Sequence, residues 1–171
     1  MGLDSVEIIV GIENAFKIRI PDSVAAKIVT PRDLVLYVSS VIEIQPSKVC
    51  QTQQIFYALR RKFPNTRAWF KPQTRLLNLC DARAWQQVWT EVRFELNSNA
   101  PEQLPSSIFG LEVRTVRELV FWVAEGNCAK TKTEIHTRET VALTIRQIVF
   151  EVTGARCFSI DAQFVRDLGL N

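Results

Sequence analysis

A nine-residue repeat constrains the fold of this chain more than any other feature. The stretch Thr30–Val38 (TPRDLVLYV) aligns with Thr115–Val123 (TVRELVFWV), with five identical positions and three conservative ones. Such a repeat indicates that one supersecondary unit occurs twice. Neighbouring segments repeat as well. Before the repeat, Glu13, Phe16 and Ile18 match Glu91, Phe94 and Leu96. In the two long helices, Ile145, Ile148 and Val149 match Ile55, Ala58 and Leu59, and in the loops that follow them Gln163 matches Gln73.

These matches divide the chain unevenly. Residues 45–125 form one complete unit, residues 1–44 form the back half of another, and residues 136–171 form a front half, with 126–135 as a linker. A half unit is too short to bury a sufficient core. The two ends of the chain are therefore expected to meet. They could meet within one chain, which we favour, or between two chains as a domain-swapped homodimer.

The periodicity of apolar residues predicts an all-α chain. Helices are expected at 5–16, 22–26, from Thr30 toward Pro46, and at 50–63, 82–96, 115–124 and 137–152. Thr30-Pro31 has the form of a helix start, Asp4 or Ser5 could cap the first helix, and Gly154 is expected to end the last one. In the first helix the expected inward residues are Val6, Ile9, Val10 and Phe16.

Composition excludes several classes of protein. No apolar run approaches the ~20 residues that span a bilayer, and the net charge is only +3. Cys50, Cys80, Cys128 and Cys157 are far apart and His136 is the only histidine, so neither a metal site nor a catalytic triad is expected. We expect buried structural thiols, a cytoplasmic location and no enzymatic activity.

The two ends of the chain carry a recognisable motif when they are read in the order tail, then head. The tail has Phe164-x-x-Asp167-Leu168-Gly169-Leu170, and the head continues with Asp4-Ser5-Val6. Ile12-Glu13-x-x-Phe16-x-Ile18-x-Ile20-Pro21-Asp22 and Thr30-Pro31-Arg32-Asp33-Leu34 follow at family-like spacing. Together these segments resemble the acyl carrier protein family, with the cut placed just before the serine.

The resemblance implies that Ser5 carries a covalent 4′-phosphopantetheine and that Asp4 is the motif residue before it. It implies two acyl-carrier-like four-helix bundles, one of them assembled from the N- and C-terminal segments. A phosphopantetheinyl transferase and acyl-transferring enzymes of fatty-acid, polyketide or related biosynthesis would be the partners. Such a carrier would hold its acyl group as a thioester.

The middle unit departs from the motif, because Asp81-Ala82-Arg83 stands where the serine would fall. This unit is expected to be unmodified, with Trp85, Trp89 and Trp122 in its core or at an interface. Two other functions stay open. One is an unmodified carrier-fold scaffold, and the other is a small nucleic-acid binder, which is disfavoured because the basic residues do not gather on one helix.

Overall fold

The computed structural model describes most of the chain. The described residues are 2–47, 50–96, 101–104, 113–130, 136–155 and 158–170, without the side chains of 127–130. Across them the chain is helical, with two isolated β-bridges and no strand, which confirms the expected all-α class. The helices are α1 (Leu3–Phe16), α2 (Asp22–Ala25), α3 (Pro31–Val41), α4 (Gln51–Lys62), α5 (Ala82–Glu95), α6 (Val116–Lys130) and α7 (Arg138–Thr153), with 3-10 turns η1 (Pro64–Thr66) and η2 (Leu76–Asn78).

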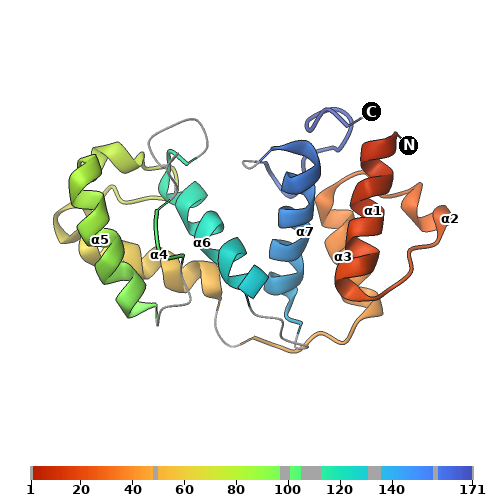
Figure 1. Cartoon of the computed structure of the whole chain (residues 1–171), viewed down its shortest axis with the longest axis horizontal. Coiled ribbons are helices and arrows are strands. Elements are labelled where there is room, and N and C mark those ends of the chain that lie inside the picture. The colour runs from red at the N-terminus through yellow and green to blue at the C-terminus, as the bar shows by residue number, and fades with distance from the viewer. Residues whose placement is uncertain are drawn as a thin grey trace. The chain divides into compact units, whose positions relative to one another are not determined.

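The chain divides into two compact units. Unit 1 consists of Met1–Ser47 together with Thr133–Asn171, and unit 2 consists of Lys48–Lys132. Unit 1 contains α1, α2, α3 and α7, and both ends of the chain lie beside α1 (Figure 1). Unit 2 contains α4, α5 and α6 with the two 3-10 turns. No described helix is both long and apolar enough to cross a membrane.

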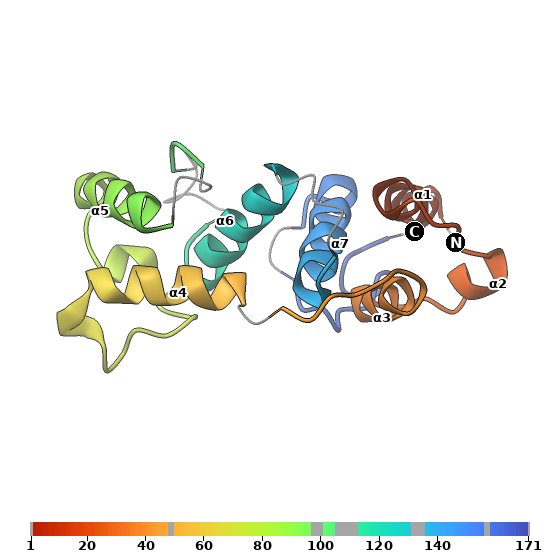
Figure 2. The ribbon, with the colours of Figure 1, turned by 90° about the horizontal axis from the view of Figure 1, so that it is seen from below.

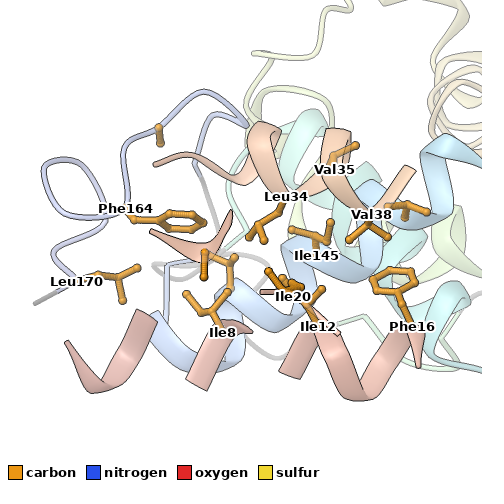
Figure 3. Close-up of a cluster of buried hydrophobic side chains, with 14 of the residues drawn as sticks. Ile8, Ile12, Phe16, Ile20, Leu34, Val35, Val38, Ile145, Phe164 and Leu170 are labelled. Atoms are coloured by element: carbon orange, nitrogen blue, oxygen red, sulfur yellow. The ribbon is translucent and has the colours of Figure 1, made fainter. Parts of the chain in front are cut away.

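The core of unit 1 joins the two ends of the chain. Helix α7 packs against both α1 and α3 (Figures 1 and 2). The C-terminal segment after α7 adds Phe164 and Leu170 to the same cluster, on the side where α1 presents Ile8 (Figure 3). Burial of apolar surface from four separate segments stabilises these short helices more than their intrinsic propensity does.

The buried face of helix α1 differs in part from the one that its sequence periodicity predicts. Phe16 is buried as expected, and Ile9 packs against the core. Ile8 and Ile12 are buried, whereas Val6 and Val10 are each nearly half exposed. The reason is a close approach to α7: a Cβ on Gly11 would lie 2.9 Å from Cγ2 of Ile148. Gly11 therefore faces α7, whereas Val6 and Val10 lie on a more exposed side of α1.

Helix α3 begins and α7 ends as expected. The Thr30 hydroxyl accepts the amide of Asp33, while the Asp33 carboxylate accepts the amide of Thr30 at 2.8 Å, forming a capping box. Gly154 closes α7 in the left-handed conformation with φ 69°. Both helix boundaries are therefore determined by local side-chain and backbone chemistry.

The segment 158–170 is tied to the start of α3 by backbone hydrogen bonds. The amide of Phe164 donates to the carbonyl of Val29 at 3.0 Å, and the amide of Arg32 donates to the carbonyl of Ile160 at 2.9 Å. An exposed ion pair between the Arg32 guanidinium and the Asp161 carboxylate lies beside them. These bonds hold an irregular segment in one register against the N-terminal helices.

Unit 2 is built around tryptophans. Trp85 and Trp89 are almost completely buried, so the expectation that they serve the core is confirmed. Their indole N–H groups donate to the carbonyls of Leu76 at 3.0 Å and Pro101 at 3.2 Å, which satisfies the polar atom of each buried ring. Trp122 is half-buried, with its ring centroid 6.1 Å from that of Trp89.

The expected linker at 126–135 is wrong in its first part, because α6 continues to Lys130. Gly126 does not break the helix. A Cβ at this position would lie 3.3 Å from Cγ of Pro101, so the glycine allows a close contact. Ala124 and Glu125 just before it are buried, which keeps this stretch of α6 packed. Residues 131–135 lie outside the described part of the chain.

If the C-terminal segment completes the core of unit 1, truncating its anchor should destabilise α1. Phe164→Ala is expected to lower the free energy of unfolding of unit 1 by about 3–5 kcal/mol, the usual range for a buried phenylalanine. Its neighbour Val165 is 71% exposed, so Val165→Ala should change it by less than about 0.5 kcal/mol. Hydrogen exchange of the α1 amides measures the stability of unit 1 in both variants. Equal protection in the two would contradict the shared core.

Candidate functional site

Ser5 lies in the first turn of α1. The helix begins at Leu3 with Gly2 as its N-cap, and Gly2 brings no side chain to the helix end. The expectation that Asp4 or Ser5 caps the helix is therefore wrong, because the helix starts earlier and both residues already have helical positions. Both side chains are partly exposed.

The backbone at this helix end is open. The first intrahelical bond of α1 runs from the amide of Val6 to the carbonyl of Gly2 at 3.3 Å. The amides of Leu3, Asp4 and Ser5 precede it and have no partner inside the helix. Such amides, together with the positive end of the helix dipole, favour an anionic group. The first turn of α1 could thus accommodate a phosphate on Ser5.

A cavity of about 340 Å³ opens beside Ser5. This volume is at the lower end of the range typical of small-molecule pockets. Apart from Ser5, the residues that line it are apolar or glycine: Gly2, Ile8, Ile9, Ala25, Ala26, Ile28, Val29, Leu34, Phe164 and Val165. The site therefore combines one hydroxyl with an apolar space next to it.

Four segments of unit 1 build the walls of this cavity. Helix α1 contributes Ile8, α2 contributes Ala25, α3 contributes Leu34, and the C-terminal segment contributes Phe164. The bond from the Phe164 amide to the Val29 carbonyl fixes the last of these. Sequence reasoning identified Ser5 and Asp4 but missed the cavity. The one local signal was the pair of small residues Ala25-Ala26 in a short helix that packs against larger apolar side chains.

The hydrogen bonds that hold the loop of unit 1 recur in unit 2. The amide of Arg117 donates to the carbonyl of Pro72 at 2.7 Å, as Arg32 does to Ile160. The amide of Leu76 donates to the carbonyl of Arg114 at 2.8 Å, as Phe164 does to Val29. The Glu118 carboxylate accepts the amide of Thr115 at 2.8 Å, in the way that Asp33 accepts Thr30.

The first turn of α5 differs from that of α1. Both helices have 14 residues, and Ala82, Arg83 and Ala84, which begin α5, have no hydroxyl group. The Asp81 carboxylate accepts the amides of Arg83 at 3.0 Å and Ala84 at 2.8 Å. Unit 2 thus has neither a hydroxyl at this position nor an open helix end, because its own carboxylate already occupies the first turn.

The cysteines differ from the expectation of buried thiols. Cys50 is exposed, because it lies at the surface where α4 begins. Cys80 is partly buried. Burial, together with the negative charge of Asp81, raises the pKa of the Cys80 thiol to about 11. The side chain of Cys128 and all of Cys157 lie outside the described residues. Cys80 therefore does not provide unit 2 with a nucleophile in place of Ser5.

Other polar groups do not assemble a second site. In the described ranges, no three His, Cys, Asp or Glu side chains gather as metal ligands. The His136 ring lies 5.4 Å from the Phe16 ring, and its carbonyl accepts the amide of Gln45 at 2.9 Å. His136 therefore helps to join the two ends of unit 1 and lies in a packing position.

The raised pKa of Cys80 predicts slow alkylation. At pH 8 only about a thousandth of this thiol is thiolate, and the thiolate is the reactive form. Cys50 should react with iodoacetamide first, while the rate at Cys80 should rise about tenfold per pH unit until the pH nears its pKa. Peptide mass spectrometry separates the two cysteines. Equal labelling rates at pH 8 would contradict the assignment.

Comparison with known proteins adds no assignment. No family model, no curated protein and no solved structure matches this chain. The candidate site therefore depends on the residues of the chain itself, chiefly the first turn of α1 and the cavity beside it.

Proposed function

We propose that this protein is an acyl carrier that holds its cargo through a 4′-phosphopantetheine attached to Ser5. One observation carries the proposal: Ser5 combines a partly exposed hydroxyl in an open helix end with an apolar cavity of about 340 Å³ directly beside it. In this proposal unit 1 is a split carrier bundle of α7, α1, α2 and α3, and unit 2 is a degenerate copy.

The residues around Ser5 fit the chemistry of the attached group. The amides of Leu3 and Asp4 and the helix dipole would stabilise the negative phosphodiester on the Ser5 oxygen. When bound, the phosphopantetheine supplies a thiol that holds an acyl group as a thioester. Its flexible length allows the thioester to leave the carrier surface and reach another protein.

The cavity suits the apolar part of the cargo. Ile8, Leu34 and Phe164 form apolar walls, and the small side chain of Ala25 leaves the space between α1 and α2 unfilled. Moving an acyl chain from water into such a space is favourable by roughly 0.8 kcal/mol per methylene group. The cavity would thus shield the chain while the carrier is in transit.

The proposal needs no catalytic group in this chain. Activation, transfer and release of the acyl group would belong to separate enzymes, beginning with a phosphopantetheinyl transferase that modifies Ser5. Asp4 would be the residue that such a transferase meets next to the serine. The partners implied are therefore proteins that recognise the exposed side of α1.

The alternative is an unmodified scaffold that keeps the fold for protein interaction. A specific observation favours it: Leu3 is 88% exposed, and Val6 and Val10, at helical spacing from it, are 48% and 46% exposed. An exposed apolar stripe on one helix is typical of an interaction surface. A carrier also needs such a surface, so the stripe alone does not separate the two functions.

Modification of Ser5 separates them. Incubation with coenzyme A and a broad-specificity phosphopantetheinyl transferase should add the mass of one phosphopantetheine to the intact protein, and Ser5→Ala should abolish this gain. Ser23→Ala is the matched control, because Ser23 is also exposed and lies in the first turn of a helix. No mass gain, under conditions that fully modify a control carrier, would leave the scaffold as the function.

The cavity gives a second test. Ala25→Phe directs a ring into the space and should leave Ser5 modified but expose the acyl chain. Hydroxylamine should then cleave the acyl thioester several times faster than in the parent protein. A parallel measurement on Val41→Ala should match the parent, because Val41 is a half-exposed residue of α3 that does not line the cavity. Equal cleavage rates in Ala25→Phe and the parent, with both proteins folded, would show that the chain does not enter the cavity.

A further inference from the structure

The charge of this chain is divided between its two units. Unit 1 has eight Lys and Arg against eleven Asp and Glu, whereas unit 2 has thirteen against seven. The small net charge of the whole chain therefore conceals an acidic unit and a strongly basic one. No acidic residue occurs between Glu43 and Asp81, a stretch that contains seven basic residues. Basic excess of this kind favours an anionic partner.

The fold brings three of these cations together. Lys71, Arg75 and Arg117 are all exposed. The loop that contains Lys71 and Arg75 is bonded to the start of α6, because Arg117 donates its amide to Pro72 and Arg75 forms an antiparallel bridge with Thr115. We call these three side chains the basic patch. Their sequence positions are too far apart to show the cluster before the chain folds.

The charges of the basic patch have no carboxylate partners in the part of the chain that the structure describes. Within the described residues, no carboxylate forms an ion pair with Lys71, Arg75 or Arg117. Some other cations of unit 2 are compensated, as Arg61 is by Glu95 and Lys62 is by Glu91. The basic patch thus contributes three of the uncompensated positive charges of unit 2.

The equivalent place on unit 1 is neutral. There the counterpart of Arg117 is Arg32, which pairs with Asp161. The register of the loop hydrogen bonds places Gln73 at the position of Asp161, and Lys71 and Arg75 at the positions of Ser159 and Gln163. The sequence match of Gln163 with Gln73 is therefore wrong by two residues. Unit 2 therefore has one acid fewer and two cations more than unit 1 on the same framework.

The patch does not form a cradle for a small anion. The first amides of α6 are already used: Val116 donates to Thr74 at 2.9 Å, Arg117 donates to Pro72, and Glu118 donates to the hydroxyl of Thr115 at 3.4 Å. Only the side chains remain to meet a ligand, and they extend from an exposed surface. The patch therefore fits an extended anionic polymer better than a single phosphate group.

An exposed aromatic ring accompanies the cations. Trp69 is 44% exposed, and the loop fixes it because the Thr74 hydroxyl donates to its carbonyl at 2.9 Å while accepting the amide of Lys71. Arg117 rests over the ring of Phe121, with 5.8 Å to the centroid. Cations and an exposed tryptophan on one loop are a combination typical of proteins that bind single-stranded nucleic acid, where phosphates meet the cations and bases stack.

We infer that unit 2 binds single-stranded nucleic acid. Lys71, Arg75 and Arg117 contact successive phosphates, and a base stacks on Trp69. This inference reverses the sequence-based expectation that nucleic acid is an unlikely partner, which depended on basic residues being scattered over several elements. It does not depend on Ser5 carrying a group, since every residue involved lies in unit 2.

Fluorescence anisotropy with a labelled oligo-dT strand tests the inference on the full chain. Three phosphate contacts predict a slope near −2 for log affinity against log salt, so binding should weaken about 20-fold between 50 and 200 mM salt. The double variant R75A/R117A should bind at least about tenfold more weakly at low salt. Arg32→Ala is the matched control, because Arg32 holds the equivalent position in unit 1, and should bind as the parent does.

Trp69→Ala separates stacking from charge. It should lower affinity about tenfold with the salt slope unchanged, because stacking does not release counterions. Circular dichroism confirms that each variant keeps its helices.

Three results would overturn the inference. The first is no binding of oligo-dT up to about 100 µM protein at low salt. The second is equal losses in R75A/R117A and Arg32→Ala. The third is a poly-glutamate peptide or an anionic lipid vesicle that competes as well as unlabelled oligo-dT of equal charge, which would identify an acidic protein or a membrane as the partner.

Discussion

The contact between the C-terminal segment and the start of α3 is the constraint on which unit 1 depends. Two backbone bonds, from Phe164 to Val29 and from Arg32 to Ile160, hold residues from opposite ends of the chain in one register. They set Phe164 in place, and Phe164 closes both the hydrophobic core and the cavity beside Ser5. Loss of this docking would remove the apolar wall of the cavity and change the environment of Ser5. The candidate site therefore depends on the same contacts that stabilise the fold of unit 1.

Much of the helical framework follows from local sequence signals, whereas the cavity does not. The capping box at Thr30, the glycine after α7 and the apolar periodicity locate helices because each depends on neighbours within a few residues. The predicted inward face of α1 is right for Phe16 but wrong for Val6 and Val10, because the close packing of Gly11 depends on Ile148, a residue of α7. Likewise, Ser5 is recognisable from its motif, but the space beside it depends on α2, α3 and the C-terminal segment meeting.

One N-cap position distinguishes the candidate sites of the two units. Asp81 directs its carboxylate onto the amides of Arg83 and Ala84, which stabilises α5 by about 1 kcal/mol and fills its end with negative charge. Gly2 provides no such group, so α1 gives up that stabilisation. An open helix end is useful when an external anion takes the place of the cap. The difference is therefore consistent with a modified serine on α1 and with an unmodified α5.

The two units also differ in charge at the loop that is bonded to the start of α3 in unit 1 and to the start of α6 in unit 2. In unit 1, Arg32 is matched by Asp161, and this exposed pair contributes little to stability while it removes a charge from the surface. In unit 2 the corresponding arginine, Arg117, forms no ion pair with an acid among the described residues, and Lys71 and Arg75 lie in the loop bonded to its helix. Concentrated like charge repels itself and does not stabilise a small fold. The positive charge of the basic patch is explained if an anionic partner neutralises it. In that case unit 2 would bind the partner, while unit 1 would carry the phosphopantetheine on Ser5.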